Sequence, residues 1–257
     1  MSEINPILFN RVDWPKYFPK VILNTPLGKA AEHPDYMAAK SGDLKAAIRL
    51  TTDLINKKAI ATLAGIIGDK KPLLIPVHAE EAISINQIPL AYAIAVGLEF
   101  DLPIEFNIVQ AARVNRTGSS GFTRLAFPPP FAGTPSNNEA TYAIIFDDTL
   151  TQGGTLANLR GYVAQFDIET IAATTLTGKN YSSVLAITDE TLKLLRDKYD
   201  ELEKWWISAF GYGFTKLTES EAKYILNTKK NADEIRDRIL AEKQEGFDGK
   251  NDSYIQI

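Results

Sequence analysis

The sequence predicts an α/β fold: a parallel β-sheet with helices on both of its faces. Three apolar runs, at 73–77, 142–146 and 168–176, have the length and composition of buried strands. Segments whose apolar residues recur at helical spacing lie between these runs. Strands that alternate with helices in this way form parallel sheets, whose ligands bind beyond the carboxyl ends of the strands.

The N-terminal segment, residues 1–34, is rich in proline and aromatic residues, so we expect it to be irregular and to lie over the core. A core domain is predicted from 35 to 180. Its first part, from 35 to about 67, has apolar residues at helical spacing and is ended by Gly65 and Gly68.

The middle of the core is predicted to alternate strand, helix and strand. After the strand at 73–77, a helix is expected from about 88 to 96, because Pro89 would lie in its first turn and Gly97 just past its end. A further strand is expected at 103–109.

The most informative segment reads YAIIFDDTLTQGGT and runs from Tyr142 to Thr155. Its apolar start is typical of a buried strand, and Asp147 and Asp148 are expected where that strand ends. A turn with two adjacent glycines follows. A helix is expected from about Thr155, because apolar residues then recur on one face.

This order of residue types is suited to a phosphorylated sugar. Glycine lets the backbone approach a phosphate closely, and the amides at a helix N-terminus favour its negative charge. Two adjacent carboxylates can accept hydrogen bonds from sugar hydroxyls or help to hold Mg²⁺. Phosphate, sugar and metal recognition are therefore all expected between Asp147 and Thr155.

The segment resembles the signature of the type I phosphoribosyltransferases: an apolar strand, two acids, two or three variable residues and a Thr-Gly-Gly-Thr-like loop. Gln152 is the one departure, because the family usually has threonine there. Glutamine removes one hydroxyl donor and keeps the backbone cradle. The resemblance implies a Rossmann-like phosphoribosyltransferase core. It covers roughly 70–180 and is specific only around 142–166.

The resemblance also implies roles for individual residues. Asp147 and Asp148 would hold the ribose 2′- and 3′-hydroxyls of phosphoribosyl pyrophosphate (PRPP) and help to hold Mg²⁺, and either is a candidate to take a proton from the acceptor. The loop would wrap the 5′-phosphate through backbone amides and hydroxyls. It consists of Thr151, Gln152, Gly153, Gly154 and Thr155.

A second motif, that of the haloacid-dehalogenase-type phosphatases, superficially matches FDDTLT. That motif requires Asp-x-Asp before x-Thr-Leu. Aligning Thr149 and Leu150 with it puts Ile145 at the position of the nucleophile. Isoleucine cannot attack phosphorus, so the chemistry excludes this interpretation.

The stretch 110–141 contains three arginines, a Gly-Ser cluster and a triple proline, without helical periodicity. The family carries a long mobile loop at about this place, which closes over the reacting centre. Arg113, Arg116 and Arg124 are then candidates to meet pyrophosphate, because guanidinium is a forked donor that matches phosphate oxygens. Arg124 is the catalytic candidate among them. The alternative is a solvated linker with incidental arginines.

The segment after the first core strand has the position of the family's pyrophosphate loop. It contains His78, Ala79, Glu80 and Glu81, where the family has small residues and often a basic one. The glutamates either face the diphosphate through Mg²⁺ or begin the next helix, whose dipole favours acids. His78 either donates to a pyrophosphate oxygen when protonated or is a structural turn residue.

Residues 181–257 are predicted to form a helical appendage, which in the family is a hood over the acceptor base. Two segments, Thr218 to Glu221 and Asn231 to Glu234, fit a helix N-cap followed by an acid three residues later. The aromatic residues here are expected mainly to pack in a core, with a base-stacking surface as the alternative. They are Trp205, Trp206, Phe210, Tyr212 and Phe214.

The composition argues against several other classes of protein. A net charge of −4 disfavours a general nucleic-acid binder. The lack of cysteine excludes disulfides and thiolate metal sites. Neither a secretory signal nor an apolar run of about 18 residues is found, so we expect a cytoplasmic protein without a membrane partner.

The sequence therefore predicts a Mg²⁺-dependent enzyme that transfers ribose 5-phosphate from PRPP to a nitrogenous base-like acceptor and releases pyrophosphate. The sequence does not identify the acceptor. The family is commonly dimeric, so the resemblance implies a homodimer as a possible partner state. The alternative is a regulator of the same fold that senses PRPP or a nucleotide without catalysis.

Overall fold

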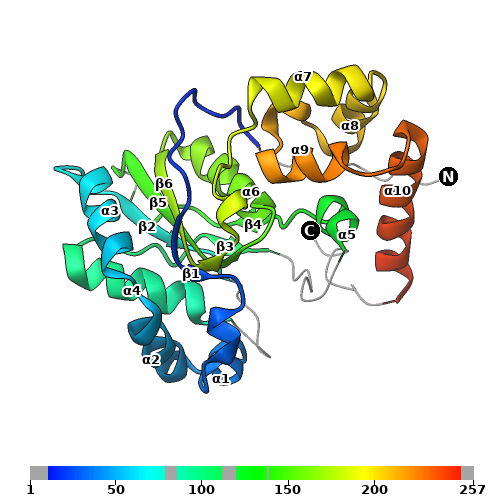
Figure 1. Ribbon diagram of the computed structural model, residues 1–257. Helices are drawn as coiled ribbons and strands as arrows, with labels where there is room; N and C mark the ends of the chain where they lie inside the picture. The colour runs from blue at the N-terminus through cyan, green and yellow to red at the C-terminus, as the bar shows by residue number, and fades with distance from the viewer. Residues whose placement is uncertain (1–10, 79–85, 112–119, 138, 250–257) are drawn as a thin grey trace.

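The computed structural model describes residues 11–78, 86–111, 120–137 and 139–249 (Figure 1). In this part of the chain the main sheet has four strands in the order β1-β6-β5-β2, and every neighbouring pair is parallel. The strands are β1 (Ile22–Pro26), β2 (Leu73–Pro76), β5 (Tyr142–Leu150) and β6 (Glu169–Gly178).

Helices cover both faces of this sheet, as predicted. Alternate residues of β5 show this, because Ile144 and Phe146 pack in one apolar cluster and Ala143 and Ile145 in another. The first cluster is completed by α3 (Lys57–Ile67) and α4 (Ile88–Phe100), and the second by α6 (Gly154–Val163). The α/β prediction with a parallel sheet is therefore confirmed.

The N-terminal segment differs from its prediction, because residues 22–26 form an edge strand of the sheet rather than irregular structure. Asn24, Thr25 and Pro26 interrupt the apolar pattern of this strand, so its periodicity is too weak to reveal it. The Asn24 side chain is nonetheless used: its amide donates to the hydroxyl of Tyr92 in α4 at 2.7 Å.

The helical stretch from 35 to 67 is divided into α1 (Tyr36–Lys40), α2 (Leu44–Leu54) and α3. Helix α1 ends ahead of Gly42, whose φ of 109° is not helical. The Asp43 carboxylate caps α2 by accepting a hydrogen bond from the amide of Ala46. Gly68, not Gly65, ends α3.

Two expectations for the middle of the core were wrong. Helix α4 continues past Gly97 to Phe100, because Gly97 packs against the backbone of Leu102 and Asp101 supplies the left-handed residue that ends the helix. The strand expected at 103–109 is reduced to a bridge at Ile104 and to β3 (Val109–Gln110), which pairs with β4 (Phe131–Ala132) in a second, antiparallel sheet.

Short elements connect the longer ones in the described part of the chain. In the stretch 110–141, expected to lack regular structure, the chain forms one helix and residues of two strands: β3 (Val109–Gln110), α5 (Gly121–Ala126) and β4 (Phe131–Ala132). The 3₁₀ turns are η1 (Lys29–Glu32), η2 (Ala164–Phe166), η3 (Asn180–Ser182) and η4 (Phe214–Lys216).

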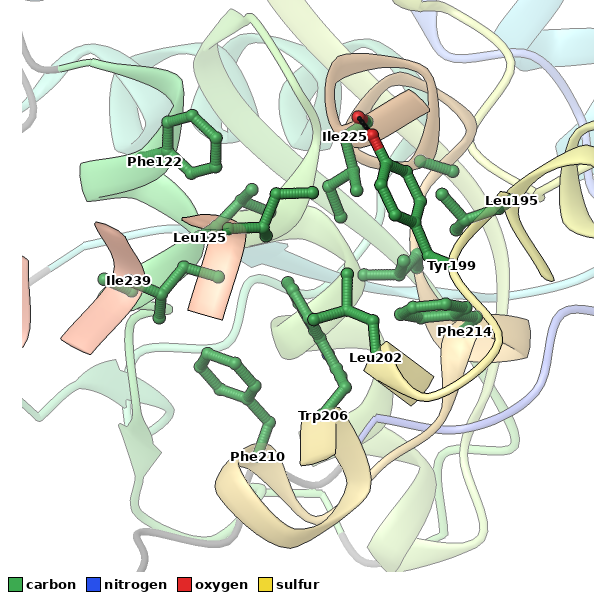
Figure 2. Packing of buried hydrophobic residues seen from close by; sticks show 14 of the residues in the cluster. Phe122, Leu125, Leu195, Tyr199, Leu202, Trp206, Phe210, Phe214, Ile225 and Ile239 are labelled. Carbon is green, nitrogen blue, oxygen red and sulfur yellow. Dashed lines mark hydrogen bonds between the residues drawn. The ribbon is translucent and has the colours of Figure 1, made fainter. Parts of the chain in front are cut away.

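The C-terminal helices form a second core beside the sheet (Figure 1). Trp206, Phe210, Tyr212 and Phe214 are buried in it, together with residues of α5 (Figure 2). These four aromatic residues are therefore packing residues, as the sequence favoured. The helices are α7 (Asp189–Lys198), α8 (Leu202–Phe210), α9 (Glu219–Leu226) and α10 (Ala232–Gly249).

Both N-cap patterns in this region are confirmed. The Thr218 hydroxyl accepts the amide of Glu221, whose carboxylate accepts the amide of Thr218 in return. Asn231 and Glu234 exchange the same two hydrogen bonds. Across the described ranges, we find no helix with the combined length and hydrophobicity needed to cross a lipid bilayer.

Candidate functional site

Asp147 and Asp148 lie on β5 where its neighbour β2 has ended, although not beyond the end of their own strand. Strand β5 continues to Leu150 and stays paired with β6 as far as Gly178. Its other neighbour, β2, ends at Pro76, opposite Phe146. The acids thus follow the carboxyl end of β2, which is where parallel sheets bind their ligands.

The Asp148 carboxylate is held by two side chains that are distant in sequence. Its Oδ2 atom accepts hydrogen bonds from Nζ of Lys40 at 2.6 Å and from Nδ2 of Asn86 at 2.9 Å. Lys40 is the last residue of α1, and Asn86 comes just before Gln87, the N-cap of α4. Neither residue belongs to a sequence motif, and no pattern in the sequence indicates them.

The surroundings of the Asp147 carboxyl group disfavour its charged form. Burial, followed by the repulsion of the adjacent Asp148, raises the pKa of Asp147 well above its ordinary value. Its Oδ1 atom accepts the amide of Asp148 at 2.8 Å. A carboxyl group with a raised pKa is a stronger base than an ordinary carboxylate, which suits a group that accepts a proton during a reaction.

Lys40 stays protonated beside these acids. Burial acts to lower the pKa of Lys40, but the attraction of Asp148 outweighs burial and the net pKa is raised. The pair is only partly shielded from water, because 29% of the Lys40 side chain and 12% of the Asp148 side chain remain exposed. The site therefore contains a permanent cation next to its two carboxyl groups.

The loop after β5 presents backbone amides at the start of α6. Gly153 has a φ of 80°, a left-handed conformation that favours glycine, and the helix begins at Gly154. The amides of residues 152–154 donate no hydrogen bond to any residue that the structure describes. Such amides at a helix N-terminus are suited to an anion. The Thr151 and Thr155 side chains beside them are half-buried.

The opposite side of this loop packs against the C-terminal helices, which gives the two glycines a structural role as well. A Cβ atom at Gly153 would overlap the side chain of Leu185, and one at Gly154 would overlap the carboxylate of Glu221. The Thr218 hydroxyl also donates to the carbonyl oxygen of Gln152 at 2.6 Å. These contacts hold the loop in place on the side that faces the C-terminal helices.

A buried ion pair completes this support. The Arg11 guanidinium donates to both carboxylate oxygens of Glu221, at 2.6 and 2.9 Å, and to Oδ1 of Asn158 in α6 at 2.6 Å. Only 2% and 3% of the Arg11 and Glu221 side chains are exposed. Burial acts to lower the pKa of Arg11, but Glu221 and Tyr212 raise it. The N-cap pattern indicated Glu221 from sequence, whereas nothing indicated Arg11.

The residues predicted at the pyrophosphate end of the site are only partly described. Both ring nitrogens of His78 face backbone carbonyl oxygens, at 3.2 Å from Pro76 and 3.1 Å from Phe106, which favours the structural role for this histidine. The other predicted residues, Ala79, Glu80, Glu81, Arg113 and Arg116, lie outside the described residues.

Arg124 lies in α5, which packs against α9 and α10. Burial lowers the pKa of Arg124, but an arginine remains charged after such a shift. The structure brings the acids and the glycine loop together along β5 and α6. The catalytic role of Arg124 stays a prediction.

Asp147 and Asp148 could help to hold a metal ion that arrives with a substrate. Within the described ranges, no group of three or more His, Asp or Glu side chains is placed to hold a metal. Mg²⁺ commonly uses one or two carboxylates and completes its shell with water and substrate phosphates. Asp147 and Asp148 can provide such a pair, with Lys40 already bound to the second.

Comparisons with known proteins find two curated relatives at high similarity. No family model matches the chain. Over 229 residues, or 89% of the chain, it is 39% identical to Protein TraN from Escherichia coli. Over 153 residues, or 60% of the chain, it is 44% identical to an uncharacterized protein from Haemophilus influenzae. The matches cover 50% of the first relative and 34% of the second, so the chain spans half or less of the relatives it matches.

Proposed function

We propose that this protein is a phosphoribosyltransferase, which moves the ribose 5-phosphate group of PRPP to a nitrogen atom of a base-like acceptor. One observation carries the proposal: two adjacent carboxyl groups, on β5 where its neighbour β2 has ended, precede amides at a helix N-terminus that donate to no residue the structure describes. This arrangement offers groups for hydroxyl recognition and for phosphate recognition along the same strand and loop.

The position of the two acids in the sheet supports this proposal. We infer a Rossmann-like core of the type I phosphoribosyltransferase kind, because the acids lie on β5, an inner strand of the parallel sheet, just past the point where its neighbour β2 ends. The amides of residues 152–154 would hold the 5′-phosphate, together with the hydroxyls of Thr151 and Thr155. Asp147 and Asp148 would accept hydrogen bonds from the ribose 2′- and 3′-hydroxyls.

In the proposed reaction the bond between C1 of the ribose and the diphosphate oxygen breaks, and the oxygen leaves with the bonding electrons. The nitrogen lone pair of the acceptor forms the new bond to C1. The sugar carries positive charge between these events, and the protein contributes by holding both reactants in line. Mg²⁺, when bound with the substrate, would neutralise the leaving diphosphate. Asp147, whose pKa is raised, is suited to accept the proton that the acceptor nitrogen releases.

Pyrophosphate release tests this function directly. The wild-type protein, PRPP and Mg²⁺ would be incubated with a panel of purines, pyrimidines and related bases. We expect release with at least one acceptor, and strongly reduced release for Asp147→Asn and Asp148→Asn. The exposed Asp69, on the loop before β2, provides a matched control as Asp69→Asn. PRPP binding without release by any acceptor would favour a regulator that senses PRPP, and neither binding nor release would contradict the proposal.

A further inference from the structure

We propose that Lys40 binds the diphosphate of PRPP and supplies the cation that the loop after β2 lacks. This inference rests on the proposed function and adds a binding residue to the same site. Lys40 comes from α1, upstream of the first core strand that the sequence resemblance covers. It enters the site through its contact with Asp148.

The first argument is the charge of the segment between β2 and α4. From Val77 to Gln87 the sequence reads VHAEEAISINQ, with two glutamates and no lysine or arginine. The ring of the one histidine faces backbone carbonyl oxygens. A diphosphate carries several negative charges, so a site that binds it must provide positive charge from another part of the chain.

The second argument is the position of the Lys40 ammonium. Nζ lies 2.6 Å from Oδ2 of Asp148, the carboxylate proposed to accept a ribose hydroxyl. In PRPP the carbon that carries the 2′-hydroxyl is bonded to the carbon that carries the diphosphate. If Asp148 holds the 2′-hydroxyl, a cation on its carboxylate would therefore lie near the leaving group.

The third argument is that the Lys40 ammonium has further N–H donors that a ligand could use. An ammonium has three N–H donors, and among the described residues Lys40 is recorded as donating to Asp148 alone. The side chain is partly exposed, so a ligand can reach it. Asn86 also donates to Oδ2 of Asp148, which keeps that carboxylate partnered if the ammonium turns toward a phosphate oxygen.

The competing explanation is that Lys40 only neutralises Asp148. The two explanations differ in which ligands should depend on Lys40. A neutralising lysine would affect every ligand that uses Asp148 to a similar extent. A diphosphate-binding lysine would affect ligands that carry the diphosphate and spare those that do not.

The test is calorimetric binding of three ligands, PRPP, ribose 5-phosphate and inorganic pyrophosphate, each with Mg²⁺. We compare the wild-type protein with Lys40→Met, Lys40→Gln and Lys40→Arg. Lys40→Gln retains a donor for Asp148 while removing the charge, so it reports on charge even if the methionine variant folds poorly. Lys45→Met, at an exposed position in α2, is the matched control.

We expect Lys40→Met and Lys40→Gln to weaken PRPP and pyrophosphate binding by about tenfold or more, the usual effect of losing a charged hydrogen bond. Ribose 5-phosphate binding should change much less, and Lys40→Arg should restore part of the loss. Equal losses for PRPP and ribose 5-phosphate would overturn the role of Lys40 and leave the proposed function intact. Failure of the wild-type protein to bind PRPP would instead overturn the proposed function, and this inference with it.

Discussion

Two ion pairs flank the glycine loop, and they differ in how far each is removed from water. Arg11 and Glu221 lie behind the loop with 2% and 3% of their side chains exposed. Lys40 and Asp148 lie ahead of the loop, where β5 extends past β2, with 29% and 12% of their side chains exposed. Both pairs have a closest N–O distance of 2.6 Å, so distance alone does not distinguish them.

The difference in burial indicates different roles. A buried charge that loses its partner has no water to replace it, so Arg11 and Glu221 must remain together while the protein is folded. Water or a ligand can replace the partner of Lys40 or of Asp148, so the members of that pair can separate. We infer that the first pair holds the loop in place and that the second exchanges its contacts for those of a substrate.

The largest expected effect is on stability, from breaking the buried pair. Arg11→Met should lower the free energy of unfolding by about 3–5 kcal/mol, because it leaves the Glu221 carboxylate buried without its partner. Denaturant titration measures this change. The double variant Arg11→Met/Glu221→Gln should recover much of the loss, since no buried charge then remains. A loss of less than about 1 kcal/mol in the single variant would show that the pair is not structural.

The next effect tests the packing between the loop and α9. Gly154→Ala should destabilise the protein by about 1–3 kcal/mol, because its Cβ atom would displace the Glu221 carboxylate and approach Arg11. Gly65→Ala is the control. Gly65 lies inside α3 with nothing within 4 Å of the added atom, so alanine there should stabilise by about 0.5–1 kcal/mol. Equal effects in thermal or chemical unfolding would refute the packing argument.

Removing the exposed pair should affect stability much less. Lys40→Met is expected to cost about 1 kcal/mol or less, since Asp148 keeps its hydrogen bond from Asn86 and remains accessible to water. Denaturant titration beside Arg11→Met gives the contrast directly. A cost as large as that of Arg11→Met would mean that both pairs are structural, and the distinction between the two sides of the loop would be lost.

The smallest expected effect is the pH dependence of stability at Asp147. Its pKa is raised in the folded protein, so between the ordinary carboxyl pKa and this raised pKa the folded state binds more protons than the unfolded state. Stability therefore falls as pH rises through that window. Asp147→Asn should raise the melting temperature at neutral pH, and the gain should shrink as the pH is lowered toward the ordinary carboxyl pKa. A gain that does not depend on pH would contradict the raised pKa.

The sequence predicted those parts of the fold and site that are encoded in contiguous residues. The segment 142–155 contains its strand, its acids and its helix start in order, and the structure has all of them, with β5 extended to Leu150. The N-caps at Thr218 and Asn231 were found for the same reason.

The missed residues depend on contacts between distant parts of the chain. Lys40 and Asp148 are 108 positions apart, and Arg11 and Glu221 are 210 apart. A single lysine or arginine has no local pattern that reveals its partner, because the fold alone brings the two together. Strand β1 was missed on similar grounds: as a short edge strand it carries polar residues that resemble a loop.

Calorimetric titration of PRPP in the presence of Mg²⁺ tests the central claim most directly. We compare the wild-type protein with the double variant Asp147→Asn/Asp148→Asn, after confirming that both are folded. The account predicts saturable binding to the wild-type protein and a loss of at least about tenfold in affinity for the variant, since each carboxylate is proposed to accept a ribose hydroxyl. Equal affinity in the two proteins would contradict it.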